Sequence, residues 1–311
     1  MMRPFSEADK GLVKVANGFK YALYLNKGVA YEALENYNEA IQNYNVALKE
    51  FPKNFQFYYN RGVVYEKLKE HEKAAEDFKQ TIVLNPFYPE AHFQLGTICY
   101  REKKMAQALM ALNMYLVLNP DGENSLSILS SINTSFSRSN DATPTGIQIS
   151  KDDDSFEDID LILSNGIALN KGYKIKNKID LPMVKQSHVL FEQLKDYDGG
   201  NGGFWNQKYV PFYNWINEND LFDAYVYTIM FSLQKSTYKK IVDKNISKIK
   251  SFIANTFTKW PSIAGANNMM TLRGKEQKVS CLYEDKKLLA IGVRKMRKKL
   301  AFGNCLILME G

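Results

Sequence analysis

The chain has 311 residues, of which 45% are hydrophobic and 24% are charged, a composition typical of globular proteins. No stretch approaches the run of about 18 apolar residues that predicts a membrane-spanning helix. The first 25 residues carry scattered charges and lack the apolar core of a signal peptide. We therefore expect no membrane span, no signal peptide and a cytoplasmic location, or a periplasmic one if the true N-terminus lies upstream.

The formal net charge is +7, and all of this excess lies in residues 151–311. Its densest part is the basic run Arg294–Lys299. Such a run can bind nucleic acid or an acidic membrane surface, but here no aromatic residues alternate with it and no recognition motif accompanies it. We therefore favour a solvated charged segment over a nucleic-acid binding site.

The cysteines indicate neither a disulfide framework nor a metal site. Cys99, Cys281 and Cys305 are far apart in the sequence, and no CxxC pair is present. A reducing compartment is consistent with this sparse, odd number.

Residues 1–20 are predicted to form a lead-in or capping helix. Ser6 is followed three residues later by Asp9 and then by an apolar run, which is typical of a helix start.

The next hundred residues repeat one pattern three times with a period of 34 residues. The recurring positions are Gly28, Gly62 and Gly96; Ala40, Ala74 and Ala108; Tyr44, Phe78 and Leu112; and Pro52, Pro86 and Pro120. A fixed period of this length is the signature of a stacked repeat array.

This spacing of small, aromatic and proline positions resembles the tetratricopeptide repeat. The resemblance implies repeats at residues 21–54, 55–88 and 89–122, each made of two antiparallel helices. We expect Gly28 to allow a close crossing of the two helices, with Ala40 meeting it from the second helix. Pro52 would end the second helix, because proline cannot continue it.

The rest of the chain is divided by its composition. Residues 123–150 are rich in Ser, Asn and Thr, and we interpret them as a capping helix followed by a flexible linker. Residues 151–270 are predicted to be a helical domain of unknown role, ending in one long helix over 237–260. Residues 271–311 are predicted to hold a β-hairpin within 277–293 and the basic tail.

The predicted fold is therefore mainly α: a tetratricopeptide helix-turn-helix solenoid, a helical bundle domain and a short C-terminal β-hairpin. Within the predicted hairpin, the sequence LYEDKKLLAIG (residues 282–292) is similar to one unit of the short hairpin repeats of bacterial surface and antitoxin-like proteins. Together with the abundance of Lys, Asn and Ile, it suggests a bacterial source.

The sequence offers no converging set of catalytic or metal-binding residues. His71 falls in the turn of the second repeat, His92 replaces a core aromatic residue, and His188 lies beside apolar positions. The glycine-rich loop at 199–203 lacks the residue order of a phosphate-binding loop. We therefore predict no catalytic, cofactor or metal site.

The resemblance implies a concave groove lined by the first helix of each repeat. The matching positions are Leu25, Val29, Glu32, Tyr59, Asn60, Val63, Glu66, Phe93, Thr97 and Arg101. Leu25, Tyr59 and Phe93 form an apolar row, which either binds a partner or is covered by the second domain or the linker helix.

Related arrays that clamp the acidic C-terminus of heat-shock chaperones use Lys, Asn and Arg at five positions. Here these positions hold Leu25, Val29, Asn60, Glu90 and Gln94, so that only Asn60 matches. An apolar segment, from another protein or peptide or from the chain itself, is therefore a more suitable partner than an acidic C-terminus.

We expect a non-catalytic adaptor or scaffold that binds a partner segment in this groove. The main rival is an enzyme of unknown reaction in residues 151–270, with the repeats as its targeting arm. A third possibility is a nucleic-acid binder that uses the basic tail. The sequence leaves the partner and the oligomeric state open.

Overall fold

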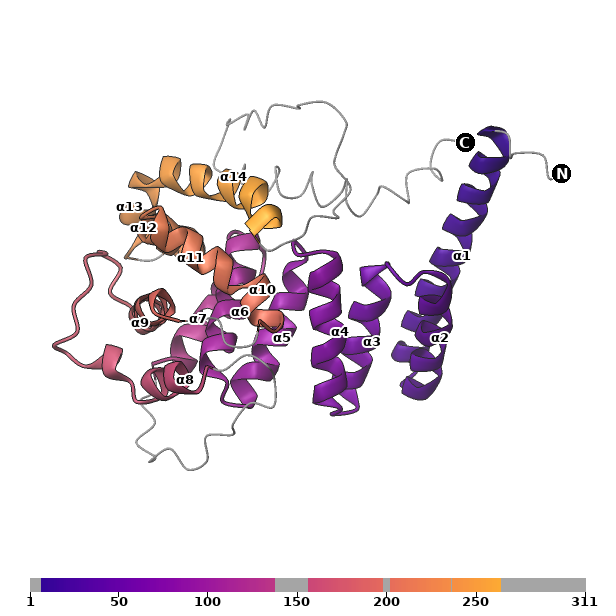
Figure 1. Cartoon of the computed structure of the whole chain (residues 1–311), viewed down its shortest axis with the longest axis horizontal. Helices are drawn as coiled ribbons and strands as arrows, with labels where there is room; N and C mark the ends of the chain where they lie inside the picture. Colours follow the sequence, from indigo (N-terminus) through magenta and orange to yellow (C-terminus); the bar gives the residue numbers. More distant parts are fainter. Residues whose placement is uncertain (1–6, 138–155, 198–201, 236, 264–311) are drawn as a thin grey trace. The chain divides into compact units, whose positions relative to one another are not determined.

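The structure is helical throughout the part of the chain that it describes. The computed structural model describes residues 7–137, 156–197, 202–235 and 237–263 (Figure 1). Fourteen α-helices and two 3-10 helices make up the regular structure of these residues, and none of them forms a β-strand. The predicted mainly helical class is confirmed, while the hairpin predicted within 277–293 lies outside the described residues.

The chain divides into two compact units between Asn85 and Pro86. The first unit contains the helices of the first two repeats: α1 (Glu7–Ala33), α2 (Tyr37–Glu50), α3 (Phe55–Lys67) and α4 (His71–Leu84). Each repeat is a helical hairpin, as the period of 34 residues implies. The predicted lead-in helix is not separate, because α1 runs without a break into the first helix of the first repeat.

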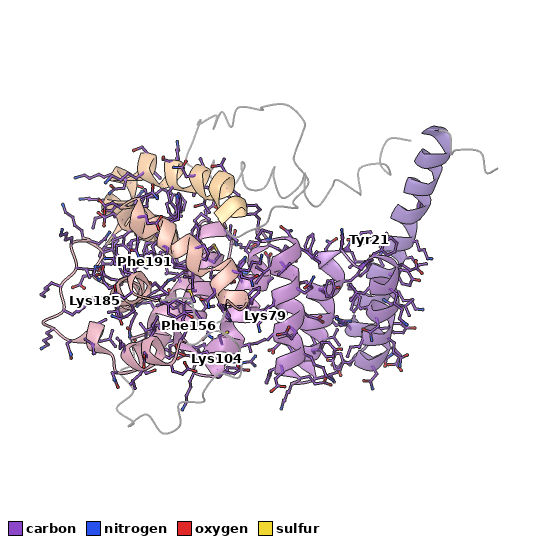
Figure 2. The ribbon with its side chains drawn as sticks, in the orientation of Figure 1. Tyr21, Lys79, Lys104, Phe156, Lys185 and Phe191 are labelled. Atoms are coloured by element: carbon purple, nitrogen blue, oxygen red, sulfur yellow. The ribbon has the colours of Figure 1, made fainter. Side chains whose placement is uncertain are left out.

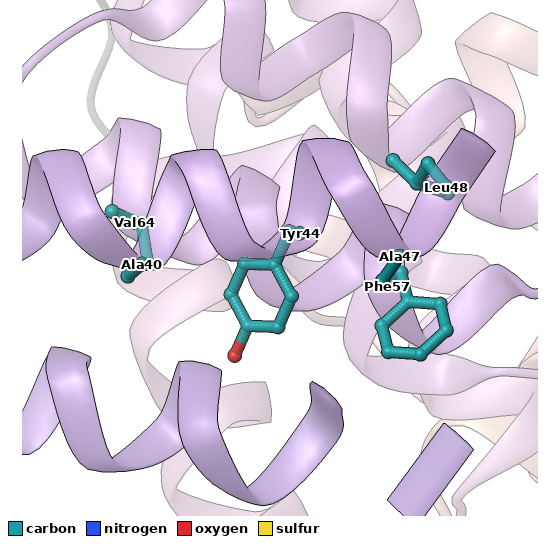
Figure 3. Close-up of a cluster of buried hydrophobic side chains, with 6 residues drawn as sticks. All are labelled: Ala40, Tyr44, Ala47, Leu48, Phe57 and Val64. Carbon is teal, nitrogen blue, oxygen red and sulfur yellow. The ribbon is translucent and has the colours of Figure 1, made fainter. Parts of the chain in front are cut away.

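Small and aromatic side chains at the repeat positions form the core of the first unit (Figure 3). Ala40, Tyr44 and Ala47 of α2 pack with Phe57 and Val64 of α3, and all five are fully buried. The alanines let α2 and α3 approach closely, and the rings fill the space between repeats.

The repeated glycines lie where the first helix of a repeat meets a large side chain of the second. A Cβ atom added at Gly28 would overlap the ring of Tyr44, and one at Gly62 would lie 2.8 Å from Cε1 of Phe78. The contact predicted between Gly28 and Ala40 is thus corrected: the nearest atoms belong to the aromatic residue one turn later. The physical reason is side-chain length, because the Tyr44 ring extends across the helix pair to Gly28 whereas the Ala40 methyl group does not.

The turn inside each repeat has a left-handed residue. Glu35, Lys69 and Lys103 have φ angles of 59°, 62° and 62°, and they recur with the period of the repeat. In the second repeat, the N–H of the next residue, Glu70, donates to the carbonyl of Tyr65 at 2.9 Å, which closes the end of α3. A residue with a side chain is strained at a positive φ angle, and glycine is usually favoured there. Because none of these three residues is a glycine, the sequence gives no sign of the left-handed turn.

The second unit holds the third repeat together with the later helices. Its elements are α5 (Pro89–Arg101), α6 (Met105–Leu118), α7 (Ser125–Ser135), α8 (Glu157–Ser164), η1 (Ile167–Leu169), α9 (Pro182–Lys195), α10 (Phe204–Lys208), α11 (Val210–Glu218), α12 (Phe222–Ile229), η2 (Phe231–Lys235), α13 (Lys239–Lys244) and α14 (Ile246–Ile263). None of the helices so described is long and apolar enough to span a membrane.

Helix α6 is the centre of this unit. Every residue from Ala106 to Leu118 is buried, because α5, α7, α8 and α12 pack around it. The period of the repeat predicts that α6 belongs to the array, but α6 also packs against α7, α8 and α12. The physical reason is the lack of any charged residue in α6, which leaves it without a face suited to solvent.

An aromatic cluster fills the space between the later helices. Phe191 of α9, labelled in Figure 2, lies 5.1 Å by ring centroids from each of Tyr213, Phe222 and Tyr225. These three rings come from α11 and α12, so the cluster ties three helices together.

The predicted long helix over 237–260 is broken. The structure has two helices, α13 and α14, which are separated at Asn245. The side-chain amide of Asn245 donates to the carbonyl of Ile241 at 2.8 Å, and this local bond competes with helix continuation.

Candidate interaction surface

Four apolar residues of the first unit lie on the first helices of neighbouring repeats. Leu25 and Val29 are one turn apart on α1, and Tyr59 and Val63 are one turn apart on α3. Val29 is 48% exposed, and the other three are half-buried. The ring of Tyr59 packs against Phe78 at 5.8 Å, which holds the side chain in place. We call Leu25, Val29, Tyr59 and Val63 the helix-A face.

Each of the two glutamates predicted at the edge of the groove has a basic side chain of the same unit as its partner. Glu32 lies 3.4 Å from Nζ of Lys67, and Glu66 lies 2.7 Å from Nδ1 of His71. His71, predicted to lie in a turn, is the first residue of α4 and is partly exposed. Both carboxylates at the edge of the helix-A face are therefore engaged by side chains of their own unit.

A further ion pair, between Arg61 and Asp77, joins the two helices of the second repeat. Nε and Nη2 of Arg61 donate to the two carboxylate oxygens of Asp77 at 2.8 and 2.6 Å, and Nη1 donates to Asn45 at 2.5 Å. The guanidinium also lies over the rings of Tyr58 and Tyr65. Burial raises the pKa of Asp77, and the bonds from Arg61 oppose that rise.

The Arg61–Asp77 pair was not predicted, although the internal repeats contain a signal for it. The same two columns hold Arg61 and Asp77 in the second repeat but Leu95 and Ala111 in the third. The third repeat thus has an apolar pair where the second has a charged one, as expected for residues in contact, while the first repeat has Lys27 and Asn43 there.

The family comparison agrees with this geometry. A family model described as tetratricopeptide repeat matches residues 25–89 and 71–123. Residues 25–123 are tetratricopeptide repeats. Repeats of this kind are generally protein–protein interaction modules. No curated protein matches the chain.

The third tetratricopeptide repeat belongs to the second unit and is described there by itself. Phe93 is half-buried, and its ring packs against Tyr115 at 5.4 Å. The hydroxyl of Thr97 donates to the carbonyl of Phe93 at 2.8 Å, within the same helix. Arg101 is exposed, but it lies one residue beyond the column of Glu32 and Glu66.

The residue in that column is Tyr100, which is already engaged. Its ring packs against Phe136 at 5.7 Å, and its hydroxyl lies 3.4 Å from the carbonyl of Ser135. The assignment of Arg101 to the same position as the two glutamates was therefore out of register. Asn60, the single match to the chaperone clamp, is half-buried on α3.

His92 has a structural environment in the second unit. Its Nε2 donates to the carbonyl of Pro86 at 2.8 Å, so Nδ1 accepts from the hydroxyl of Tyr209 at 2.5 Å. Burial lowers the pKa of His92 to about 4. The imidazole is therefore neutral near pH 7 and held in one tautomer.

His188 is placed in a similar way on α9. Its Nδ1 lies 2.7 Å from the hydroxyl of Tyr173, and its ring meets that of Phe222 edge-on at 5.2 Å. Burial lowers its pKa as well. In the described part of the chain, no group of three or more His, Cys, Asp or Glu side chains is placed to hold a metal ion.

An acidic side chain caps α6 from another helix. Oδ1 of Asp160, on α8, accepts the N–H of Ala106 at 2.6 Å. Burial raises the pKa of Asp160 to about 7, although the bond from Ala106 opposes this shift. The carboxyl group of Asp160 thus serves as a hydrogen-bond acceptor at the N-terminus of α6.

Proposed function

We propose that this protein is a non-catalytic adaptor that binds an apolar segment of a partner protein on the helix-A face. The observation that carries the proposal is the exposure of Val29 between neighbours that are rigidly packed. Leu25 packs against the core of the first unit, and Tyr59 is held by Phe78. An exposed apolar surface on a rigid support loses little conformational freedom when it binds a partner.

The charges around this surface support an apolar partner over an acidic one. Recognition of a carboxylate needs cations or amide donors. Lys67 and His71 are already engaged by Glu32 and Glu66. At the clamp positions of the first repeat, Leu25 and Val29 have no donor to offer a carboxylate.

The environments of the ionisable groups in the second unit support a structural role for that unit. His92 and His188 bond to tyrosine hydroxyls, and Asp160 caps α6. Each of these groups is explained by the packing of the helices. On this proposal the second unit supports the third repeat and carries no reaction of its own.

Capture of partner proteins by two matched variants of the full chain tests the proposal. Val29 and Val46 are both exposed valines of the first repeat, at 48% and 45%, but only Val29 belongs to the helix-A face. We expect Val29→Glu to lose the proteins that the wild-type chain captures, and Val46→Glu to retain them. Thermal unfolding of both variants should match the wild type, since both positions are exposed.

The same experiment can contradict the proposal. If the Val29→Glu variant captures the same proteins in the same amounts as the wild type, the helix-A face is not the binding surface. If the wild-type chain captures nothing and the second unit converts a substrate, the enzyme hypothesis takes its place.

A further inference from the structure

A lysine-rich segment connects η1 and α9 in the second unit. Residues 170–180 contain four lysines and a single acidic residue, and we call this segment the lysine loop. All four lysines are exposed: Lys171, Lys174, Lys176 and Lys178. Figure 1 shows the connection between α8 and α9, which contains the lysine loop, extending away from the helices of its unit.

The residues between the lysines hold the lysine loop against the unit. The hydroxyl of Tyr173 lies 2.7 Å from Nδ1 of His188 on α9. The side-chain amide of Asn177 donates to Asp223 on α12 at 2.7 Å, and its oxygen accepts the N–H of Ile179 at 2.9 Å. Asn177 and Ile179 are buried, whereas the lysines on both sides of Asn177 are exposed. The loop is therefore anchored at three points and leaves its lysines in solvent.

The positive charge of the lysine loop is not neutralised within the described residues. Asp180, the acidic residue of the loop, pairs with Lys185 of α9 at 2.9 Å instead. No side chain in the described part of the chain forms an ion pair with any of the four lysines. Like charges held close together repel one another, so a segment of this kind is stabilised by an anionic surface.

An exposed isoleucine lies next to the lysine loop in the sequence. Ile167 of η1 is 47% exposed and stands four residues before Lys171. The adjacent Ala168 is buried, so η1 packs on the unit with Ile167 on its outer side. An exposed apolar residue beside lysines suits a lipid interface, where apolar groups reach the acyl boundary and ammonium groups stay at the headgroups.

We propose that the lysine loop binds the surface of an anionic lipid bilayer. Such a surface presents many negative charges without a fixed geometry, which suits lysine, a point charge on a flexible stem. The four lysines contact the lipid headgroups, and Ile167 inserts between them. This membrane contact goes beyond the adaptor function and does not depend on it.

A nucleic acid suits the lysine loop less well. Binding of single strands uses exposed rings on which the bases stack. The aromatic residue of the loop, Tyr173, is half-buried and its hydroxyl is engaged by His188. The loop also lacks arginine, the residue that binds phosphate through two parallel hydrogen bonds. Ile167 has no role in binding a phosphate backbone.

Co-sedimentation of the full chain with lipid vesicles tests the proposal. We expect the wild type to bind vesicles of equimolar phosphatidylcholine and phosphatidylserine, to release them as the salt concentration rises, and not to bind phosphatidylcholine alone. Each lysine near an anionic surface contributes about fivefold to binding. Replacement of all four lysines of the loop by glutamine should therefore lower the partition coefficient by on the order of several hundredfold.

A matched control removes lysines from another surface of the same unit. Lys240, Lys244 and Lys248 of α13 and α14 are exposed and have no ion pair within the described residues. Their replacement by glutamine should leave vesicle binding near the wild-type level, and both variants keep the basic run at 294–299. Thermal unfolding of both should match the wild type, since all the positions are exposed. An equal loss per lysine in the two variants would show that binding follows net charge and would overturn the site.

A second pair of variants tests the insertion of Ile167. Ile167→Ser should weaken vesicle binding by about tenfold, because it removes an apolar side chain from the interface. Leu126→Ser, at a position of α7 that is 39% exposed, should not. An unchanged affinity of Ile167→Ser would overturn the insertion.

Two results would overturn the proposal as a whole. One is a wild-type chain that does not bind the phosphatidylserine vesicles. The other is retention of a DNA oligonucleotide, in place of the vesicles, that is lost when the four lysines are replaced; this would assign the loop to nucleic acid. Both results are separable from the adaptor proposal, because replacement of the loop lysines leaves partner capture through Val29 intact.

Discussion

The second helices of the three repeats share their marker residues but have different surroundings. α2 and α4 carry charged residues and turn one face to solvent, whereas α6 carries no charge and is buried on every side. Gly, Ala and Pro at the repeat positions determine the hairpin in all three cases. The positions between these markers determine whether the hairpin faces solvent or forms the core of a larger unit.

The largest effect on stability should come from substitutions at one position of the repeat, which is exposed in the first repeat and buried in the third. Val46 is 45% exposed on α2, and Met114, two periods later, is fully buried on α6. We expect Met114→Glu to lower the free energy of unfolding by more than about 4 kcal/mol, because it buries an unpaired charge. Val46→Glu should change it by less than about 0.5 kcal/mol. Equal losses in urea unfolding would contradict the difference between the two helices.

The ion pair of the second repeat should show the next largest effect. Removing only Arg61, as in Arg61→Leu, leaves the buried Asp77 without its partner and should cost about 3 kcal/mol. The double variant Arg61→Leu/Asp77→Ala copies the third repeat, which has Leu95 and Ala111 there. It should recover most of the loss, as measured by a double-mutant cycle in urea. A double variant as unstable as the sum of the single ones would show that the pair does not act as a unit.

Two glycines of the first unit should respond to the same substitution with opposite signs. A Cβ at Gly62 would lie 2.8 Å from the buried ring of Phe78, whereas one at Gly18 meets nothing within 4 Å. We expect Gly62→Ala to lower the free energy of unfolding by about 1–3 kcal/mol through overpacking. Gly18→Ala should raise it by about 0.5–1 kcal/mol, because alanine favours the helix. Thermal unfolding of the two variants checks both signs.

The smallest effect should be a change in pH dependence at the start of α6. The pKa of Asp160 rises from 3.8 to about 7 on folding, so the folded chain holds a proton that the unfolded chain releases in this range. Its contribution to stability is present below pH 3.8 and is lost as the pH rises towards about 7. His92, with its pKa lowered to about 4, acts in the opposite direction and partly hides this loss.

Asp160→Asn keeps an oxygen for the N–H of Ala106 but removes the titration. Its free energy of unfolding, relative to the wild type, should therefore increase with pH between about 4 and about 7. Urea unfolding of both proteins across this range measures the difference. A constant difference would mean that the carboxyl of Asp160 does not titrate in the folded chain as proposed.

The sequence predicted the repeats well because their marker residues act locally. Gly28 and Ala40 allow the two helices of a repeat to approach closely, and Pro52 ends the second helix. These effects can be inferred without knowing what packs against the helix pair. The break at Asn245 was not predicted, because a side-chain bond to a carbonyl one turn earlier leaves no mark on apolar spacing. The burial of α6 was missed, although its charge-free sequence contained the signal.

The candidate site could be predicted only in part. Leu25, Val29, Tyr59 and Val63 follow from the period of the repeat, and the structure places them on α1 and α3 as expected. The pairing of the nearby glutamates with Lys67 and His71 could not be derived, because it depends on the side-chain geometry of two helix turns. Only the comparison of the second repeat with the third gave a signal for the Arg61–Asp77 pair, because the first repeat has Lys27 and Asn43 at these positions.

Site-specific photo-cross-linking in the full chain tests the central claim most directly. A photoreactive phenylalanine analogue at position 29 samples the helix-A face, and the same analogue at position 46 samples an equally exposed position of the same repeat. The account predicts a covalent adduct from position 29 only, with mass spectrometry locating the attachment in an apolar segment of the partner. Adducts of equal yield from both positions, or an attachment in an acidic C-terminus, would contradict it.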